Sequence, residues 1–341
     1  MRIGGQYVGL GLGDVSEETR LLKAFMRRKF SYAKALEDTP IYDPQLVTAV
    51  AQMQGRYNQD GKLASGTYTP GVINLETKYV MGYLQRPPGP DTRPVLFTVC
   101  GTGVPWWVGP DADTARAVED KWRWQPIGYP AQPFPMSPSI NAGKAELRAQ
   151  LNRDEPGFQL RKQVERNGAG LAGYSQGAVV TSETWEFDIK PDNGALNWVK
   201  DHMLKAVTWA NPSREQGHAY PDPGAPMAAP NTAGVAYITD RLHDTPPWWR
   251  DYAHAGDLYA TGGTTDAAGQ DKTAIWRIVR GEKFFIGPDT LLEQFLEVAQ
   301  QPLAGAMGAF KAMLDAGMFF AGGTGPHVNY NIGPAIDYLR A

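Results

Sequence analysis

The sequence predicts an α/β fold, in which a central parallel β-sheet is covered by helices on both faces. Residues 95–100 form a continuous apolar run, which is typical of a strand buried on both of its faces. Strand-like and helix-competent stretches alternate after it, as they do in parallel sheets with helical crossovers. The sequence Gly-Tyr-Ser-Gln-Gly at residues 173–177 joins an apolar stretch to a helix-competent one, which indicates a strand, a tight turn and a helix.

Length and composition indicate two domains and argue against some classes of function. The chain has 341 residues, 42% of them hydrophobic, which suffices for one large core and a smaller second one. The formal net charge of −3 gives no basic field for nucleic acid, so we expect no nucleic-acid partner. Cys100 is the only cysteine, which excludes an intrachain disulfide and a cysteine-based metal site.

Neither a signal peptide nor a membrane span is expected. The apolar run at residues 7–12 is short, broken by glycine and without a small-residue cleavage pattern, so we expect no signal peptide. The sequence has no run of about eighteen apolar residues, so we expect no transmembrane helix. A protein of this kind needs another route of release if its target lies outside the cytoplasm.

Residues 1–84 are predicted to form a small helical domain. Apolar residues recur there at helical intervals in three stretches: residues 17–30, 43–57 and 74–84. The next segment, residues 85–94, holds four prolines and a glycine, and this composition resists helix and sheet alike. We therefore expect a linker at residues 85–94 and a larger domain at residues 95–341.

The larger domain is predicted to alternate strands and helices. In chain order we expect a strand at 95–100, central in the sheet, a helix at 113–122, a strand at 171–174, a helix at 176–187 and a strand at 204–210. Residues 287–321 then carry two amphipathic patterns separated at Pro302, which predict a helical insertion. Its helices either pack on the sheet as core or form an apolar lid or acyl-binding cap.

Ser175 is the expected nucleophile of a serine hydrolase. A serine oxygen can attack an ester when a tight turn holds it out of the strand. Gly173 and Gly177 let the backbone take strained angles without a Cβ clash. The alternative is a glycine-rich turn whose serine only caps the following helix.

The partners of Ser175 are expected downstream, because the chain order in this kind of hydrolase is serine, acid, histidine. All five histidines follow Ser175, but only His327 leaves room for a strand and an acid before it, so we expect it to be the general base. Asp257 is the preferred acid, since it follows a small-residue turn, and Asp251 is the reserve. The other candidates are Asp240, Asp244, Asp266 and Asp271. A helix cap or surface turn is the alternative role for Asp257.

Two backbone amides are expected to stabilise the oxyanion of the transition state. One comes from the residue after the nucleophile, Gln176, and the other from the loop after an early strand, Thr102. The alternative for residues 101–103 is an ordinary strand-ending turn. No metal or cofactor is required by this chemistry, and none is expected.

Other conspicuous residues have structural explanations. The tryptophans and a tyrosine near predicted loops either fill the core or form an apolar substrate surface: Trp106, Trp107, Trp122, Trp124, Trp248, Trp249 and Tyr129. Cys100 is expected to be a small buried residue at a strand end. Asp111 and Asp113 suggest a cation site only weakly, and helix capping is the better interpretation.

The assembled motifs resemble the mycobacteriophage lysin B family, which is a cutinase-like α/β-hydrolase family of mycolylarabinogalactan esterases. The resemblance covers nearly the whole chain and is carried by six short stretches: residues 97–103, 125–130, 173–177, 209–212, 256–259 and 325–327. It implies that Ser175, Asp257 and His327 form the catalytic triad. It also implies that residues 287–321 correspond to an extra helical region near the active site.

This resemblance implies an esterase that cleaves the bond between mycolic acids and arabinogalactan in the mycobacterial envelope. Such a protein is made in the host cytoplasm and released to the envelope when lysis begins. A general lipase or cutinase-like esterase shares every catalytic residue and remains an alternative. A wall-binding protein without catalysis is an alternative of another class.

The N-terminal residues resemble, more weakly, the peptidoglycan-binding module found in some members of the family. The stretches that carry this resemblance are residues 42–54 and 71–83. The sequence departs from the usual repeat at residues 58–66. From the two matching stretches, we expect residues 1–84 to be a peptidoglycan-binding-like module.

Overall fold

The computed structural model describes most of the chain. The described residues are 2–3, 6–7, 9–65, 67–86, 91–133, 135–154, 159–264, 267–280 and 325–341. The helical insertion expected at residues 287–321 lies outside them. Among the described residues, no helix is both long enough and apolar enough to cross a membrane.

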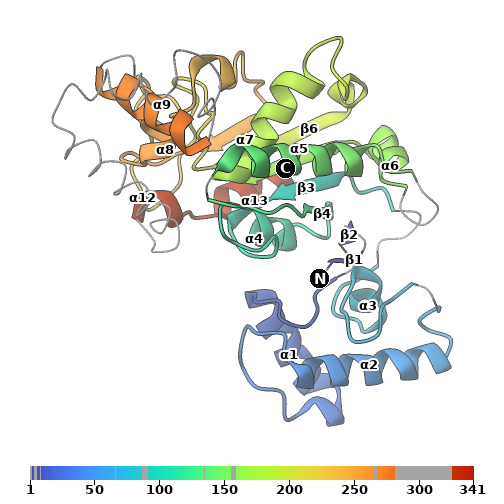
Figure 1. Cartoon of the computed structure of the whole chain (residues 1–341). Coiled ribbons are helices and arrows are strands. Elements are labelled where there is room, and N and C mark those ends of the chain that lie inside the picture. The colour runs from blue at the N-terminus through green and yellow to red at the C-terminus, as the bar shows by residue number, and fades with distance from the viewer. Residues whose placement is uncertain are drawn as a thin grey trace.

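Three helices form most of the N-terminal part: α1 (Glu17–Lys29), α2 (Pro44–Gln59) and α3 (Leu75–Val80). Each begins after a polar residue whose side chain accepts a hydrogen bond from the first turn, namely Ser16, Asp43 and Asn74. The helices share a core of their own with the chain before and between them: Leu10, Leu22, Met26, Ala33, Leu36, Tyr42, Leu46, Ala49, Val50, Met53, Ile73 and Met81. Figure 1 shows them, in blue, beside the part of the chain that contains the sheet.

The larger part confirms the predicted α/β fold. Its sheet has five strands, all parallel, in the order β4-β3-β5-β6-β7. The strands are β3 (Val95–Val99), β4 (Arg123–Ile127), β5 (Ala169–Tyr174), β6 (Met203–Trp209) and β7 (Trp249–Tyr252). Strand β3 is buried along its whole length between β4 and β5, and β5 is the middle strand.

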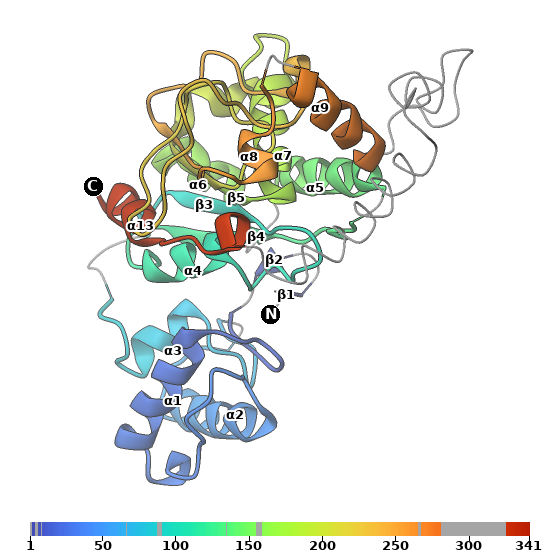
Figure 2. The same ribbon diagram turned by 90° about the vertical axis from the view of Figure 1, so that its left-hand side faces the viewer.

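Helices cover both faces of this sheet (Figures 1 and 2). On one face lie α5 (Met136–Leu151), α6 (Leu160–Asn167) and α7 (Gln176–Glu183), and on the other α4 (Pro110–Ala117) and α13 (Gly333–Arg340). Successive side chains of a strand point to opposite faces. Accordingly, Phe97 of β3 belongs to the core under α5 and α7, while Leu96 belongs to the core under α4.

The structure describes further helices and strands. They are β1 (Arg2–Ile3), β2 (Gln6–Tyr7), η1 (Ser31–Ala33), η2 (Thr184–Ile189), η3 (Asn197–His202), η4 (Ile238–Asp240), α8 (Leu258–Thr261), α9 (Ala267–Arg280) and α12 (Gly325–Val328). Strands β1 and β2 pair antiparallel. Helix α8 follows β7 by a short turn, and α12 is the first element after residues 281–324.

Strands β4 and β7 were not predicted from the sequence, and both are edge strands. Strand β4 contains Pro126, which an edge strand tolerates because one side of it needs no ladder hydrogen bond. Strand β7 contains two charged residues, which hide its strand character. Trp249, which was expected near a loop, begins β7 and is fully buried. Helix α4 begins at Pro110, earlier than expected, because proline is well suited to the first position of a helix.

Ionic contacts join the N-terminal part to the larger one. Lys78 of α3 is 1% exposed and forms salt bridges with Glu18 of α1, at 2.9 Å, and with Glu119, which follows α4. Arg93, inside the predicted linker, is also buried and donates to the Glu119 carbonyl at 2.7 Å. The C-terminal end of that segment is therefore packed on the larger part.

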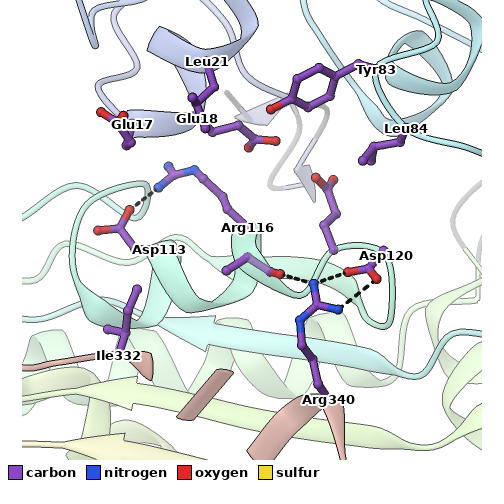
Figure 3. Close-up of a pocket in the computed structure, with 12 residues that line it drawn as sticks. Glu17, Glu18, Leu21, Tyr83, Leu84, Asp113, Arg116, Asp120, Ile332 and Arg340 are labelled. Atoms are coloured by element: carbon purple, nitrogen blue, oxygen red, sulfur yellow. Dashed lines mark hydrogen bonds and ion pairs between the residues drawn. The ribbon is translucent and has the colours of Figure 1, made fainter. Parts of the chain in front are cut away.

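A pocket of about 610 Å³ opens at this junction (Figure 3). Its walls come from both parts of the chain: Glu17, Glu18, Leu21, Tyr83 and Leu84 on one side, and Asp113, Arg116, Ala117, Glu119, Asp120, Ile332 and Arg340 on the other. Arg116 and Arg340 are held by the carboxylates of Asp113 and Asp120. The pocket thus combines ion-paired charged groups with apolar side chains such as Leu21 and Leu84.

Candidate active site

Ser175 lies on a strained turn between β5 and α7. Its backbone has φ 53° and ψ −116°, a conformation that residues with a Cβ rarely adopt. A Cβ on Gly173 would lie 2.7 Å from Thr181 Oγ1, and one on Gly177 would collide with the carbonyl oxygen of Val99. Both glycines are therefore needed for β5, α7 and β3 to meet here. Ser175 makes no side-chain cap to α7, so the alternative of a helix-capping serine gains no support.

The structure brings Ser175, His327 and Asp257 together in one hydrogen-bonded chain. Ser175 Oγ lies 3.0 Å from His327 Nε2, and His327 Nδ1 lies 3.0 and 3.1 Å from the two carboxylate oxygens of Asp257. All three side chains are buried. Because Nδ1 faces a carboxylate, it carries the ring proton and leaves the Nε2 lone pair facing the serine hydroxyl. Chemically, this arrangement can take a proton from Ser175 and stabilise the imidazolium that results.

Asp257 also caps helix α8, so the structural alternative for this residue holds alongside the contact with His327. Its Oδ1 accepts from the amides of Tyr259, at 2.9 Å, and Ala260, at 3.3 Å. Its Oδ2 accepts from the hydroxyl of Tyr330 at 3.3 Å. Burial and the charge of Asp257 raise the pKa of Tyr330 well above its usual value. The phenol therefore stays protonated and donates to the carboxylate.

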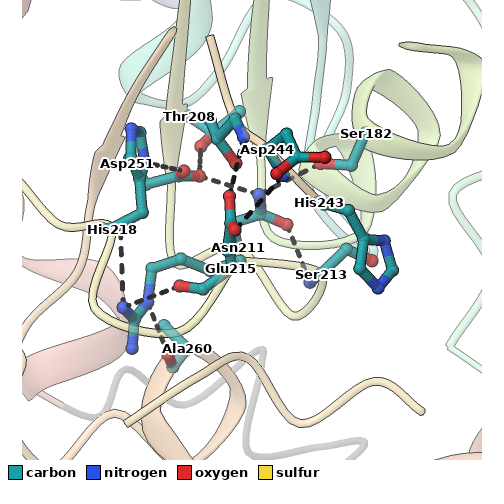
Figure 4. A network of polar contacts seen from close by, with 12 residues as sticks. Ser182, Thr208, Asn211, Ser213, Glu215, His218, His243, Asp244, Asp251 and Ala260 are labelled. Atoms are coloured by element: carbon teal, nitrogen blue, oxygen red, sulfur yellow. Dashed lines mark hydrogen bonds and ion pairs between the residues drawn. The ribbon is translucent and has the colours of Figure 1, made fainter. Parts of the chain in front are cut away.

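Asp251, the reserve acid, belongs to a different network (Figure 4). It lies in β7, where Oδ1 accepts from Thr208 Oγ1 and, at 2.8 Å, from Asn211 Nδ2. Its Oδ2 lies 2.9 Å from Nδ1 of His218. Burial opposes the charged form of His218, but the hydrogen bond and charge of Asp251 outweigh it and raise the pKa of His218. The described contacts of the Asp251 carboxylate are thus with residues other than His327.

Of the remaining acid candidates, the structure describes the side chains of Asp240 and Asp244, and neither is among the described contacts of the His327 ring. Asp240 is half-buried at the end of η4, and Asp244 is exposed with its amide bound to Glu215 at 3.2 Å. Asp266 lies outside the described residues. Asp271 lies in α9, and its side chain is outside what the structure describes.

The two expected oxyanion donors flank the serine. Gln176 is the first residue of α7, and Thr102 is buried in the loop after β3. That loop runs beside the nucleophile, because a Cβ on Gly101 would lie 3.4 Å from Ser175 Cβ. Within the described chain, neither amide donates a backbone hydrogen bond. Both are therefore available to a developing oxyanion.

The residues that hold the segment around His327, in the short helix α12, were not predicted from the sequence. Tyr174 donates from its hydroxyl to the His327 carbonyl at 3.1 Å, and His254 Nδ1 lies 3.0 Å from the Pro326 carbonyl. His254 was considered only as a rival general base. Its position three residues before Asp257 is the one signal in the sequence, and it does not reveal a contact with a segment seventy residues later.

The described residues offer no group of three histidine, cysteine, aspartate or glutamate side chains that could hold a metal ion. Asp111 and Asp113 do not act as a pair, because Asp113 binds Arg116 at 2.8 Å and Asp111 is fully buried in the first turn of α4. Burial raises the pKa of Asp111 to about 8, so this carboxyl is protonated at neutral pH. A neutral acid is a poor cation ligand.

The aromatic residues and Cys100 mostly pack in the core. Trp122 and Trp124 are buried, and their ring nitrogens donate to the Leu339 carbonyl and to Thr98 Oγ1. Trp106 and Trp107 are half-buried and meet edge to face, with ring centroids 5.0 Å apart. Cys100 is buried at the end of β3, as expected of a small apolar residue.

Comparison with known proteins places the chain in a family. It is 41% identical over 261 residues to endolysin B of Mycobacterium phage D29, a match that spans 73% of this chain and 99% of that protein. It is 40% identical over 261 residues to endolysin B of Mycobacterium phage L5, with the same shares. The chain belongs to the lysin B family. The crystal structure of lysin B from mycobacteriophage D29 agrees, with a TM-score of 0.63 and 39% identity over 73% of this chain and all of that one.

No protein-family model matches the sequence, so membership rests on these lysin B relatives. The match to the solved lysin B extends over the whole of that chain. The predicted resemblance to lysin B is thereby confirmed.

Proposed function

We propose that the protein is a serine esterase that cleaves the ester bond between mycolic acids and arabinogalactan in the mycobacterial envelope. The observation that carries the proposal is the hydrogen-bonded chain from Ser175 Oγ through His327 to the Asp257 carboxylate. Membership of the lysin B family supports a role in the lysis of a mycobacterial host. The described pocket at the junction of the two parts is not needed for this chemistry.

In the first half of the reaction, Ser175 Oγ attacks the ester carbonyl carbon while His327 Nε2 takes its proton. Asp257 keeps the imidazole in the required tautomer and stabilises the imidazolium. The amides of Thr102 and Gln176 bind the oxyanion of the tetrahedral intermediate. His327 then gives the proton to the departing sugar oxygen, which leaves Ser175 acylated by the mycolate.

In the second half, His327 takes a proton from a water molecule as the water oxygen attacks the acyl carbon. The tetrahedral intermediate collapses, the proton returns to Ser175 Oγ, and the mycolic acid is released. Neither a metal nor a cofactor takes part in either half.

Residues 1–84 are proposed to hold the enzyme on the cell wall by binding peptidoglycan. The proposed site of action is the host envelope, which the enzyme reaches when lysis begins. Sedimentation of the Ser175→Ala variant with peptidoglycan stripped of mycolates measures wall binding without turnover. Failure to sediment under these conditions would remove this part of the proposal and leave the esterase unaffected.

The decisive experiment incubates the protein with purified mycobacterial mycolylarabinogalactan, followed by lipid extraction. We expect free mycolic acid from the native protein and none from Ser175→Ala. Ser182→Ala serves as the matched control, because Ser182 lies on the same helix and its hydroxyl accepts from Asn211 rather than facing His327.

Two other outcomes are informative. Hydrolysis of a short nitrophenyl ester without mycolate release would indicate a general carboxylesterase. Equal activity of Ser175→Ala and the native protein on both substrates would sink the assignment of the nucleophile.

A further inference from the structure

His327 lies in the short helix α12, and the segment from Pro326 to Asn331 contacts the rest of the fold at both of its ends. Before the histidine, the carbonyl of Pro326 accepts from His254 Nδ1 at 3.0 Å. After it, the amide of Asn331 donates to Asp222 Oδ2 at 2.8 Å. His254 and Asp222 are themselves joined, with Nε2 2.9 Å from the same Oδ2. One buried His–Asp pair therefore holds both flanks of the proposed general base.

His254 also contacts the turn that carries the proposed acid. Its backbone carbonyl accepts the amide of Asp257 at 3.1 Å, and Gly256 completes the turn with φ 84°. The backbone of His254 also forms an isolated antiparallel β-bridge with Met227. The backbone of His254 thus contacts the turn that carries Asp257, and its side chain contacts the segment that carries His327.

The two hydrogen bonds of the His254 ring require a specific number of protons. The Pro326 carbonyl can only accept, so His254 Nδ1 must carry a proton. A second proton must then lie between Nε2 and the Asp222 carboxylate, on one atom or the other. Loss of that proton would leave a lone pair facing a carboxylate, or a lone pair facing a carbonyl, and would break one of the two ties.

The surroundings of the pair leave little freedom to re-form these contacts. His254 and Asp222 are 1% and 3% exposed. The ring of Tyr330 stacks on the imidazole with centroids 4.1 Å apart, and its hydroxyl reaches Asp257. Tyr252 is another titratable group near the pair, because the charge of Asp222 contributes to the raised pKa of its phenol after burial. The described side chains therefore shield the pair from bulk solvent.

We propose that the His254–Asp222 pair is a positioning device that aligns His327 with Ser175 and Asp257, and that it works only while it holds its second proton. This inference rests on the proposed function, because it assigns a role in aligning the proposed triad. Neither residue touches the reacting atoms, so both act through His327. Misplacement of a catalytic group by about 1 Å can cost on the order of a hundredfold in rate.

The test compares Asp222→Asn and His254→Gln with the native protein on a water-soluble nitrophenyl ester across pH 5–10. For Asp222→Asn we expect kcat to fall about ten- to hundredfold, with KM within about twofold of native. We also expect the alkaline limb of its kcat profile to move at least about one pH unit lower, because the amide cannot stabilise the protonated imidazole. His254→Gln should lose the alkaline limb assigned to the pair.

The matched control is His218→Gln. It breaks another His–Asp pair, in which Asp251 is buried and His218 half-buried, and the described contacts of His218 do not include residues 325–331. We expect its kcat profile to keep the native alkaline limb. An unmoved limb in Asp222→Asn, or an equal shift in His218→Gln, overturns the inference.

A second measurement uses the native protein and keeps the inference testable if the variants do not fold. NMR at neutral pH should show a slowly exchanging proton on His254 Nδ1, as its contact with the Pro326 carbonyl requires. A His254 ring without a protected Nδ1 proton would overturn the inference. The proposed function fails separately, if Ser175→Ala keeps native activity.

Discussion

Asp257 contacts His327 with both carboxylate oxygens, which lie 3.0 and 3.1 Å from Nδ1. An amide in its place would turn an N–H toward the ring on one side and favour the wrong imidazole tautomer. We therefore predict that Asp257→Asn lowers kcat on the order of 10⁴-fold while the protein remains folded. The measurement is kcat on a nitrophenyl ester, with circular dichroism as the check of folding.

The control for that prediction is Asp251→Asn. Since Asp251 binds His218, Thr208 and Asn211, this change should lower the free energy of unfolding by about 1–3 kcal/mol. Its effect on kcat should stay within a few-fold. The opposite ranking of the two variants in kcat would transfer the role of the acid to Asp251.

Asp111 predicts a pH dependence of stability. Burial raises the pKa of this carboxyl to about 8, whereas in the unfolded chain it is close to 4. Its contribution to stability is therefore complete below about pH 4 and is lost as the pH rises to about 8. As the pH rises through that range, ionisation of Asp111 lowers the free energy of unfolding by up to about 1.4 kcal/mol per pH unit.

Urea denaturation from pH 4.5 to 8 measures this contribution. Asp111→Asn should flatten the pH dependence, because its amide does not titrate. Asp192→Asn is the control, since the Asp192 side chain is 99% exposed and should leave the slope unchanged. Identical slopes for the native protein and Asp111→Asn would show that the carboxyl is ionised in the folded state.

A single methyl group added at Gly177 should greatly reduce the stability of the fold. A Cβ at this position would collide with the carbonyls of Val99 and Cys100, which belong to the backbone at the end of β3 and cannot rotate away. We expect Gly177→Ala to destabilise the fold by at least about 3 kcal/mol, measured by urea denaturation. Gly55→Ala, in α2, meets no atom within 4 Å and should stabilise by about 0.5–1 kcal/mol. Equal effects at the two sites would contradict the close approach of α7 and β3.

The salt bridges of Lys78 should help to hold the N-terminal part on the larger one. Replacing it with Met leaves the carboxylates of Glu18 and Glu119 buried without their cation, at a cost of about 3–5 kcal/mol. We expect faster proteolysis within residues 85–94 in Lys78→Met at pH 7. The double variant Lys78→Met, Glu119→Gln should recover part of the native resistance, because it removes the repulsion.

Lowering the pH should also strengthen the packing of the N-terminal part on the larger part in Lys78→Met. Burial, reinforced by the charge of Glu119, raises the pKa of Glu18 even in the native protein, where Lys78 opposes the shift. Glu18 therefore favours the packed state below its ordinary pKa, and this contribution is lost as the pH rises through its raised value. Proteolysis of the variant should slow as the pH falls from 7 toward 5. A rate independent of pH would point to a junction that does not depend on Glu18.

The parts of the fold that could be predicted are those encoded locally. Strand β3 is apolar at every position because both of its faces are buried, and the turn at Ser175 needs its two glycines for steric reasons. Strands β4 and β7 escaped prediction because an edge strand does not need an apolar pattern. The α/β class follows from the interior strands alone.

The candidate site was predictable only in part for the same reason. Ser175 is set by its neighbours in sequence, but the choice between Asp257 and Asp251 depends on which one faces His327 and which one His218. Those contacts join segments far apart in the chain. The ties of His254 to Pro326 and of Asp222 to Asn331 are of the same kind, and no local pattern reveals them.

The contacts at Pro326 and Asn331 confine the positioning of His327 to a short piece of chain. The His254–Asp222 pair holds one contact immediately before the histidine and the other four residues after it. Substitutions elsewhere in the chain that leave these two contacts in place should therefore keep the three triad side chains in line. An engineer who transfers this site to another protein should move residues 326–331 together with His254 and Asp222.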